Sequence, residues 1–157
     1  MPVFQRETTF DAPLDAVWRL HTTGEGLARL TPSVFDLRIE AVRGADTDET
    51  LPEGAEIDVS TNPGGVGGRD RWTSVIVESE LDDDRAVFTD EMHDGIFPTW
   101  VHTHSFETVF GDETLMRDRI EYRLPTVAGD LVSPFAPVGF VPMFAYRHWK
   151  AARILES

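Results

Sequence analysis

Four side chains in the second half of the chain have the chemistry of a functional site: Asp90, His102, His104 and Asp118. His102 and His104 are two residues apart in a run that reads as a strand, so both imidazoles point to one face. Imidazoles and carboxylates together can transfer protons, and they can also hydrogen-bond a carbonyl or hydroxyl group of a ligand. These four are therefore the candidate catalytic residues, although the residues alone assign them no reaction.

Side-chain alternation places aromatic residues on the same strand faces as these polar groups. On the strand that carries Asp118, the opposite face is rich in arginine and is expected to meet water. Ser105 falls on the face opposite the two histidines, which argues against a serine triad. We expect the aromatic faces to be concave and to form a cavity wall with members of residues 135–141. The expected wall residues are Trp72, Phe88, Trp100, Phe106, Tyr122 and Phe144.

Polar groups buried in such a wall need partners, because an unpaired buried polar group costs several kcal/mol. We therefore expect hydrogen bonds among the four candidates, with Arg147 or Tyr122 as further members. Pairing with a carboxylate is expected to fix the imidazole tautomer and to favour protonated histidine. The predicted ligand-binding set is Trp72, Phe88, Asp90, Trp100, His102, His104, Phe106, Asp118, Tyr122, Phe144 and Arg147.

Three interpretations of the cluster stay open at this point. It can be the polar end of a hydrophobic cavity, where it orients a ligand's carbonyl or hydroxyl group. It can be a structural network that ties the sheet together. It can also be catalytic, with His102 or His104 as general acid or base beside Asp118. The remaining histidines, His21, His93 and His148, have no obvious partner in the sequence, and surface or structural roles are expected for them.

The elements that must position these residues follow from periodicity. Alternating runs predict strands, two short helices follow the first strand, and a change of period predicts a C-terminal helix capped by Ser133 and Pro134. Pro137 and Pro142 are expected to kink or split that helix. The result is an α+β layout in which an antiparallel seven-stranded sheet wraps around the last helix. The predicted strands are 3–11, 34–43, 55–61, 70–79, 85–92, 99–110 and 113–124, and the predicted short helices are 13–21 and 25–30.

This order of elements resembles the helix-grip fold of the START and birch-pollen-allergen (SRPBCC) superfamily, in a branch of small stand-alone bacterial and archaeal proteins described as cyclase/dehydrase-like. The resemblance covers nearly the whole chain, which is expected to be one domain over 1–157. It rests on Phe10-Asp11-Ala12-Pro13 with Ala16-Val17-Trp18, on Val87-Phe88-Thr89-Asp90, on Trp100-Val101-His102-Thr103-His104-Ser105-Phe106, and on Tyr122-Arg123-Leu124-Pro125.

The resemblance implies binding of a small hydrophobic or amphipathic ligand, lipid-, quinone- or polyketide-like, between the sheet and the C-terminal helix. A ligand-binding protein is the favoured interpretation, and two alternatives stay open. One is a cyclase/dehydrase-like enzyme that uses a His/Asp acid–base pair in the same cavity. The other is a non-catalytic protein-interaction module. The His-X-His pair with Asp90 or Asp118 resembles a zinc-like shell, but the aromatic neighbours and the superfamily's habits favour no metal and no other cofactor.

Composition limits the remaining possibilities. Among the 157 residues, 28 are acidic and 14 are basic, a net charge of −14, which argues against a nucleic-acid-binding surface. Lys150 is the only lysine, and an acid-rich, lysine-poor chain suggests a salt-rich (halophilic) cytoplasm. The absence of cysteine excludes disulfides and thiolate metal sites. No run is apolar enough to span a membrane, and the N-terminus does not read as a signal peptide. A cytoplasmic monomer or homodimer is expected.

Overall fold

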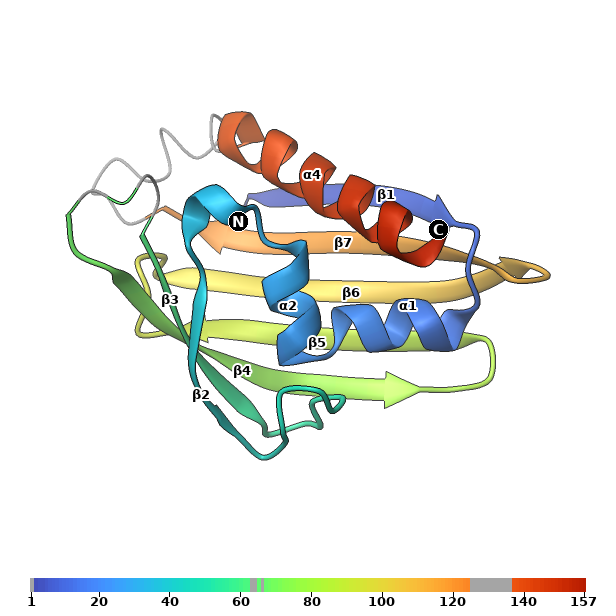
Figure 1. Ribbon diagram of the computed structural model, residues 1–157, viewed down its shortest axis with the longest axis horizontal. Helices are drawn as coiled ribbons and strands as arrows, with labels where there is room; N and C mark the ends of the chain where they lie inside the picture. The colour runs from blue at the N-terminus through green and yellow to red at the C-terminus, as the bar shows by residue number, and fades with distance from the viewer. Residues whose placement is uncertain (1, 63–64, 66, 125–136) are drawn as a thin grey trace.

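The computed structural model describes residues 2–62, 65, 67–124 and 137–157, with side chains from 140 onward in the last segment. One antiparallel sheet dominates the structure (Figure 1), and its seven strands follow the order β1-β7-β6-β5-β4-β3-β2. The sheet and its antiparallel pairing were predicted from the alternating runs, and both are confirmed. The strands are β1 (Val3–Phe10), β2 (Arg38–Arg43), β3 (Glu56–Thr61), β4 (Asp70–Leu81), β5 (Arg85–His93), β6 (Thr99–Phe110) and β7 (Glu113–Arg123).

The helices cover one face of this sheet (Figure 1). Helices α1 (Leu14–His21) and α2 (Gly24–Leu30) follow β1, and α4 (Pro137–Leu155) ends the chain and contacts β1, α1 and α2. Gly26 allows the tight turn between the two short helices, because a Cβ there would lie 1.7 Å from the backbone oxygen of Leu20. Among the described helices, none is long and apolar enough to cross a membrane.

Two sequence predictions about these elements need correction. The strand predicted over 34–43 begins only at Arg38, because a short 3₁₀ helix, η1 (Ser33–Phe35), precedes it and ends at Asp36 in a left-handed conformation, with φ of 45°. Pro142 lies inside α4 without dividing it into separate helices, contrary to the expected split. A proline early in a helix removes only a hydrogen bond of the first turns. The predicted cap at Ser133 and Pro134 lies outside the described residues.

Strand register brings the four polar candidates together. Asp90 on β5 is the pairing partner of His102 on β6, and His104 on β6 is the pairing partner of Asp118 on β7. Alternation on β7 buries Asp118 and its even-numbered neighbours, while Arg117 points to the exposed face. The candidates therefore lie side by side on the helix-covered face, as the periodicity predicted.

The same face carries two separate hydrophobic clusters. One extends under α1 and contains Trp18, Phe88 and Phe106; the other lies beneath the first half of α4 and contains Tyr122 and Phe144. Ring contacts show that the polar residues lie between the clusters. His104 lies against Phe88 and Phe106, and His102 meets the Phe144 ring edge-on with 5.5 Å between ring centres.

Candidate functional site

Asp118 is the centre of the site, and the whole residue is 1% exposed. The Nε2–H of His102 donates to Asp118 Oδ1 over 2.9 Å. The Nε2–H of His148, from α4, donates to Asp118 Oδ2 over 2.5 Å. The network continues from His148 Nδ1 to the hydroxyl of Thr8 on β1, 2.6 Å away. One carboxylate therefore links strands β6 and β7 to the C-terminal helix.

His104 approaches the same carboxylate in a different way. Its Nδ1 is 2.7 Å from Asp118 Oδ1, but it makes no aligned hydrogen bond to that oxygen or to any other described atom. Its ring lies beside that of His102, with centres 4.0 Å apart. The contact with Asp118 is thus electrostatic, and the hydrogen-bonding capacity of a buried ring nitrogen is left unused.

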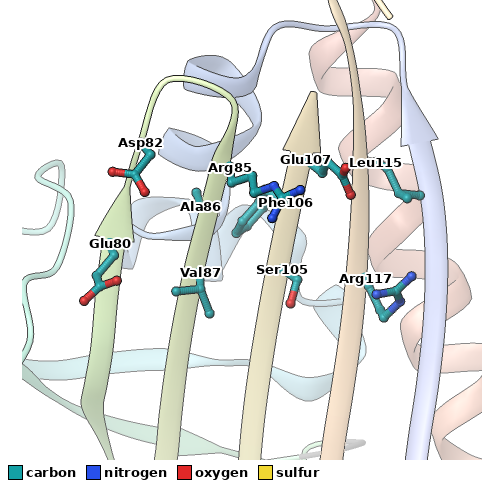
Figure 2. A pocket seen from close by; sticks show the side chains of 10 residues that line it. All are labelled: Glu80, Asp82, Arg85, Ala86, Val87, Ser105, Phe106, Glu107, Leu115 and Arg117. Carbon is teal, nitrogen blue, oxygen red and sulfur yellow. The ribbon is translucent and has the colours of Figure 1, made fainter. Parts of the chain in front are cut away.

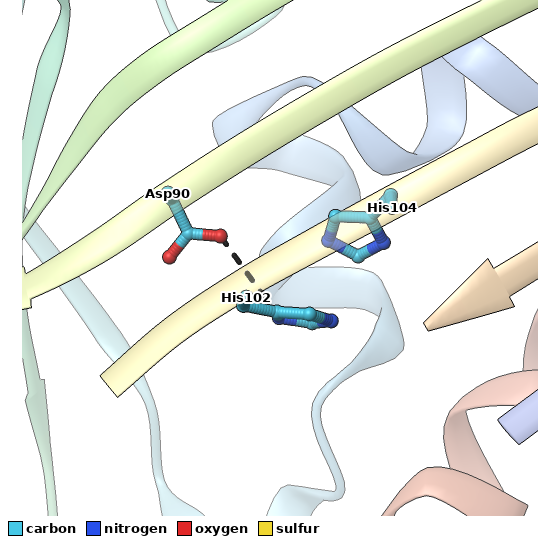
Figure 3. A group of neighbouring side chains, drawn as sticks. All are labelled: Asp90, His102 and His104. Carbon is cyan, nitrogen blue, oxygen red and sulfur yellow. Dashed lines mark ion pairs between the residues drawn. The ribbon is translucent and has the colours of Figure 1, made fainter. Parts of the chain in front are cut away.

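Asp90 forms the more open end of the site. Ser74 Oγ donates to Asp90 Oδ2 over 2.9 Å. The other oxygen, Oδ1, lies 3.9 Å from His102 Nδ1, too far for a hydrogen bond. Figure 3 shows this carboxylate pointing toward the His102 ring, with His104 further along β6. The Asp90 side chain is 18% exposed, so it is more accessible than Asp118.

The two carboxyl groups have opposite electrostatic environments. Burial raises the pKa of Asp90, and the nearby His104, Ser74 and Arg147 only partly offset it. Burial acts on Asp118 in the same direction, but the nearby His104 and the hydrogen bonds from its imidazole partners hold its pKa well below the ordinary value. Two carboxyl groups whose pKa values move apart are suited to different roles in proton transfer.

The buried environment favours the neutral form of the His21 and His104 imidazoles. Burial, followed by the nearby His104, lowers the pKa of His21 to about 3. Burial, followed by His102, also lowers the pKa of His104, and the neighbouring Asp118 does not reverse it. The expectation that a carboxylate partner favours protonated histidine is therefore wrong for His104. Desolvation of the charged ring outweighs the ion pair at this position.

Two histidines have partners that were not visible in the sequence. His148 was expected to have no obvious partner, yet it hydrogen-bonds Asp118 and Thr8. His21 hydrogen-bonds the Val17 carbonyl through Nδ1 over 2.8 Å, and its ring centre lies 5.9 Å from that of His104. Its contacts place it at the edge of the cluster. His93, in contrast, is exposed beside Glu91, which agrees with the surface role expected for it.

The other predicted ligand-binding residues surround the cluster at different distances. The Arg147 guanidinium lies 5.9 Å from the Phe144 ring centre. Burial lowers the pKa of Arg147 against the opposing charges of Asp118 and Asp90. Trp100 and Tyr122 pack edge-on against Phe140. Trp72, on β4, packs against the cluster beneath α1.

Two hollows lie on the other side of the sheet. The first has a volume of about 350 Å³, and Figure 2 shows Glu80, Val87, Ser105 and Arg117 lining it on the face away from the helices. The second is next to it and includes Gln5 and Arg117. Ser105 thus faces away from the histidines, as predicted. The cavity expected between the sheet and the C-terminal helix stays a prediction, and part of its expected wall at 135–139 lies outside the described side chains.

Comparison with solved structures shows the fold. Protein CV1439 from Chromobacterium violaceum is 15% identical, with a TM-score of 0.69 over 99% of this chain and 97% of that one. Norcoclaurine synthase from Thalictrum flavum, in complex with dopamine and hydroxybenzaldehyde, is 16% identical, with a TM-score of 0.63 over 99% and 87%. TTHA0849 from Thermus thermophilus is 22% identical, with a TM-score of 0.62 over 98% and 99%. These similarities establish the helix-grip architecture.

Comparison with protein families is more specific. A search of curated proteins finds no significant match. Residues 10–139 match the family described as polyketide cyclase / dehydrase and lipid transport. This range includes α1, α2, strands β2 to β7 and all four polar candidates. The chain therefore belongs to the polyketide cyclase/dehydrase and lipid-transport family.

Proposed function

We propose that the chain binds a small hydrophobic or amphipathic ligand with a carbonyl or hydroxyl group, and that the Asp90 end of the polar cluster orients that group. The observation that carries this proposal is the position of the cluster, between two aromatic clusters on the helix-covered face. A ligand there would contact apolar rings along its length and imidazole or carboxyl groups at one end, which is the usual composition of small-molecule sites.

Family membership and the unsatisfied groups support the same function. The family includes cyclases, dehydrases and lipid-transport proteins, and the similar norcoclaurine synthase holds small aromatic compounds. Within the cluster, His104 Nδ1 has no aligned hydrogen bond, and Asp90 Oδ1 faces His102 at 3.9 Å without one. Buried polar atoms in this state gain more from a ligand's polar group than satisfied ones would.

A pair of bicyclic probes tests the orienting role. 1-Tetralone carries a carbonyl group, and tetralin is the corresponding hydrocarbon. Binding of each to the wild type and to the H102Q and H104Q variants is measured by quenching of tryptophan fluorescence. Loss of one hydrogen bond is worth about 1 kcal/mol, so the affinity for tetralone should fall about fivefold to tenfold. The affinity for tetralin should stay unchanged.

His93→Gln is the matched control, because it makes the same chemical change at an exposed histidine of the same sheet. Circular dichroism checks that each variant is folded. If both probes lose affinity equally in H102Q and H104Q, the histidines shape the fold and do not recognise the carbonyl. If neither probe binds the wild type, the ligand-binding proposal is wrong for this class of compound.

The opposed environments of Asp90 and Asp118 favour a second candidate, a cyclase/dehydrase-like enzyme. A raised pKa lets Asp90 carry a proton for donation, while His104 remains a neutral acceptor near it. Exchange of the α-protons of 1-tetralone for deuterium, followed by NMR, measures such proton transfer directly. Acceleration by the wild type that is lost in D90N and kept in H93Q would support catalysis, and equal rates with and without protein would contradict it.

A further inference from the structure

We propose that Asp90, His102 and His104 together bind one divalent transition-metal ion. The three residues each offer a ligand atom, and these atoms lie within 4.8 Å of one another. Two imidazoles and one carboxylate form a donor set suited to zinc or to ferrous iron. The inference concerns the metal alone and does not depend on whether the chain binds an organic ligand.

The distance between Asp90 and His102 fits two ligands of one ion better than it fits a hydrogen bond. Asp90 Oδ1 and His102 Nδ1 are 3.9 Å apart. Two donors bound at about 2.0–2.1 Å in tetrahedral geometry lie roughly 3.4 Å apart. The Asp90–His102 pair needs to close by about 0.5 Å, and the most distant pair of the set by at most about 1.4 Å.

The outer atoms of these two ligands are already held by other residues. The Nε2–H of His102 donates to Asp118, which leaves Nδ1 as the nitrogen that faces Asp90. Ser74 occupies Asp90 Oδ2, which leaves Oδ1 facing His102. Metal-binding histidines almost always donate their second ring N–H to a carboxylate or carbonyl, and metal-binding carboxylates are hydrogen-bonded in the same way. Both conditions are met here before any ion is bound.

His104 is the third member of the donor set. It is only 4% exposed, and its Nδ1 makes no aligned hydrogen bond. Its ring lies beside that of His102, 4.0 Å between centres, so one ion can reach both rings. Nδ1 lies against Asp118 Oδ1, 2.7 Å away, which leaves Nε2 as the ring nitrogen for an ion beside Asp90.

The surroundings also suit a divalent cation. Asp90 and Asp118 bring two carboxyl groups near the ion, while Arg147 is the cationic side chain that opposes it. Phe88, Phe106 and Phe144 surround the imidazoles and limit the access of water. A dry shell of this kind strengthens the electrostatic attraction between ligands and metal.

Chelator-treated wild-type protein is titrated with Co²⁺ and with Zn²⁺ by isothermal titration calorimetry, and bound metal is counted by mass spectrometry after desalting. About one equivalent per chain is expected, with Co²⁺ showing visible absorption bands of a nitrogen- and oxygen-ligated ion. The ligand variants D90N and H104Q should lose affinity by about 100-fold or more. D118N should lose about 10- to 100-fold, because it removes a residue that only holds the ligands.

Two controls separate this site from adventitious binding. His93→Gln removes an exposed histidine, and D46N/D48N disrupts the exposed acidic group of Asp46, Asp48 and Glu49. Neither should change the stoichiometry. A readout that needs no variant is the ¹H–¹⁵N NMR spectrum of the imidazoles, in which Zn²⁺ should shift His102 and His104 but not His93. An unmetallated wild type, or binding that D90N and H104Q leave intact, would overturn the proposal.

Discussion

Asp118 and Glu121 lie three residues apart on β7, on opposite faces of the sheet. Their exposure and their partners differ accordingly. The Asp118 side chain is 2% exposed, and imidazoles from β6 and α4 surround it. The Glu121 side chain is 35% exposed and pairs with Arg119 on its own strand. Neighbouring cross-strand pairs alternate in the same way, with His104 opposite Asp118 and Ser105 opposite Arg117.

The difference shows that position, and not residue type, separates the two kinds of charge in this acidic chain. Outer-face ion pairs such as Arg43 with Asp58 are solvated, so each contributes little to stability. The inner carboxylate has lost its water, and only its imidazole partners compensate that loss. Mutations at matched positions on the two faces can test this contrast.

The largest effect is expected for D118N compared with E121Q. Breaking a buried charged network by changing one partner costs about 3–5 kcal/mol, because the remaining groups stay buried with poor partners. Changing an exposed pair costs about 0–1 kcal/mol. Urea denaturation at constant salt measures both. A D118N variant no less stable than E121Q would show that the inner network contributes nothing to folding.

Between about pH 7 and about pH 4 the pH effect should come mainly from the inner side. The folded-state pKa of His21 is about 3, below its ordinary 6.5. Between these two pH values the unfolded chain binds a proton at His21 and the folded chain does not. The free energy of unfolding should therefore fall as pH decreases from about 6.5 toward about 3, by up to about 1.4 kcal/mol per pH unit for this group.

The lowered pKa of His104 acts in the same direction, and that of Asp118 adds a loss below about pH 4. Asp90, with its raised pKa, opposes them, because its folded form holds the proton more tightly. The free energy of unfolding, measured by denaturation at each pH from about 7 to about 4, should depend less on pH for H21N than for the wild type. The exposed control H93N should show the same pH dependence as the wild type. An equal pH dependence for H21N and the wild type would contradict the lowered pKa of His21.

A smaller effect is expected when salt screens the outer face. With 28 acidic and 14 basic residues, repulsion among exposed carboxylates should weaken the fold at low ionic strength. Raising KCl from about 0.1 M to about 1 M shortens the screening length from about 10 Å to about 3 Å. The melting temperature should rise by several degrees, as in proteins of salt-rich cytoplasm. A melting temperature independent of KCl would remove the halophilic hypothesis.

The smallest change is expected at a single outer ion pair. Arg43 donates to Asp58 over 2.7 Å and 2.8 Å and also reaches Glu56. R43Q should still cost less than about 1 kcal/mol, and less again in high salt. A loss as large as that of D118N would mean that geometry on the outer face matters as much as burial on the inner one.

Most of the fold could be predicted from the sequence because the strands alternate so regularly. On β6 and β7 a period of two, read without any structure, already placed His102, His104 and Asp118 on one face. The strand register then brings the four residues together, because it pairs Asp90 with His102 and His104 with Asp118. The order of the elements also carried the resemblance that the family comparison confirms.

The members of the cluster that the sequence did not predict lie on helices. His148 follows Phe144 by one helical turn, so a common face with a buried aromatic was visible in the sequence. Its partner was not, because Asp118 lies 30 residues away and the packing of α4 on the sheet brings them together. The lowered pKa of His104 depends on how deeply three rings are buried, which a strand pattern does not specify.

A ligand's polar group should meet the buried imidazoles at the Asp90 end of the cluster. The most direct test is a ¹H–¹⁵N NMR titration of the histidine side chains in the metal-free protein with 1-tetralone. The imidazole signals of His102 and His104 should shift with saturation, and that of His93 should stay in place. Binding of the ketone that leaves the His102 and His104 signals unmoved would contradict the claim.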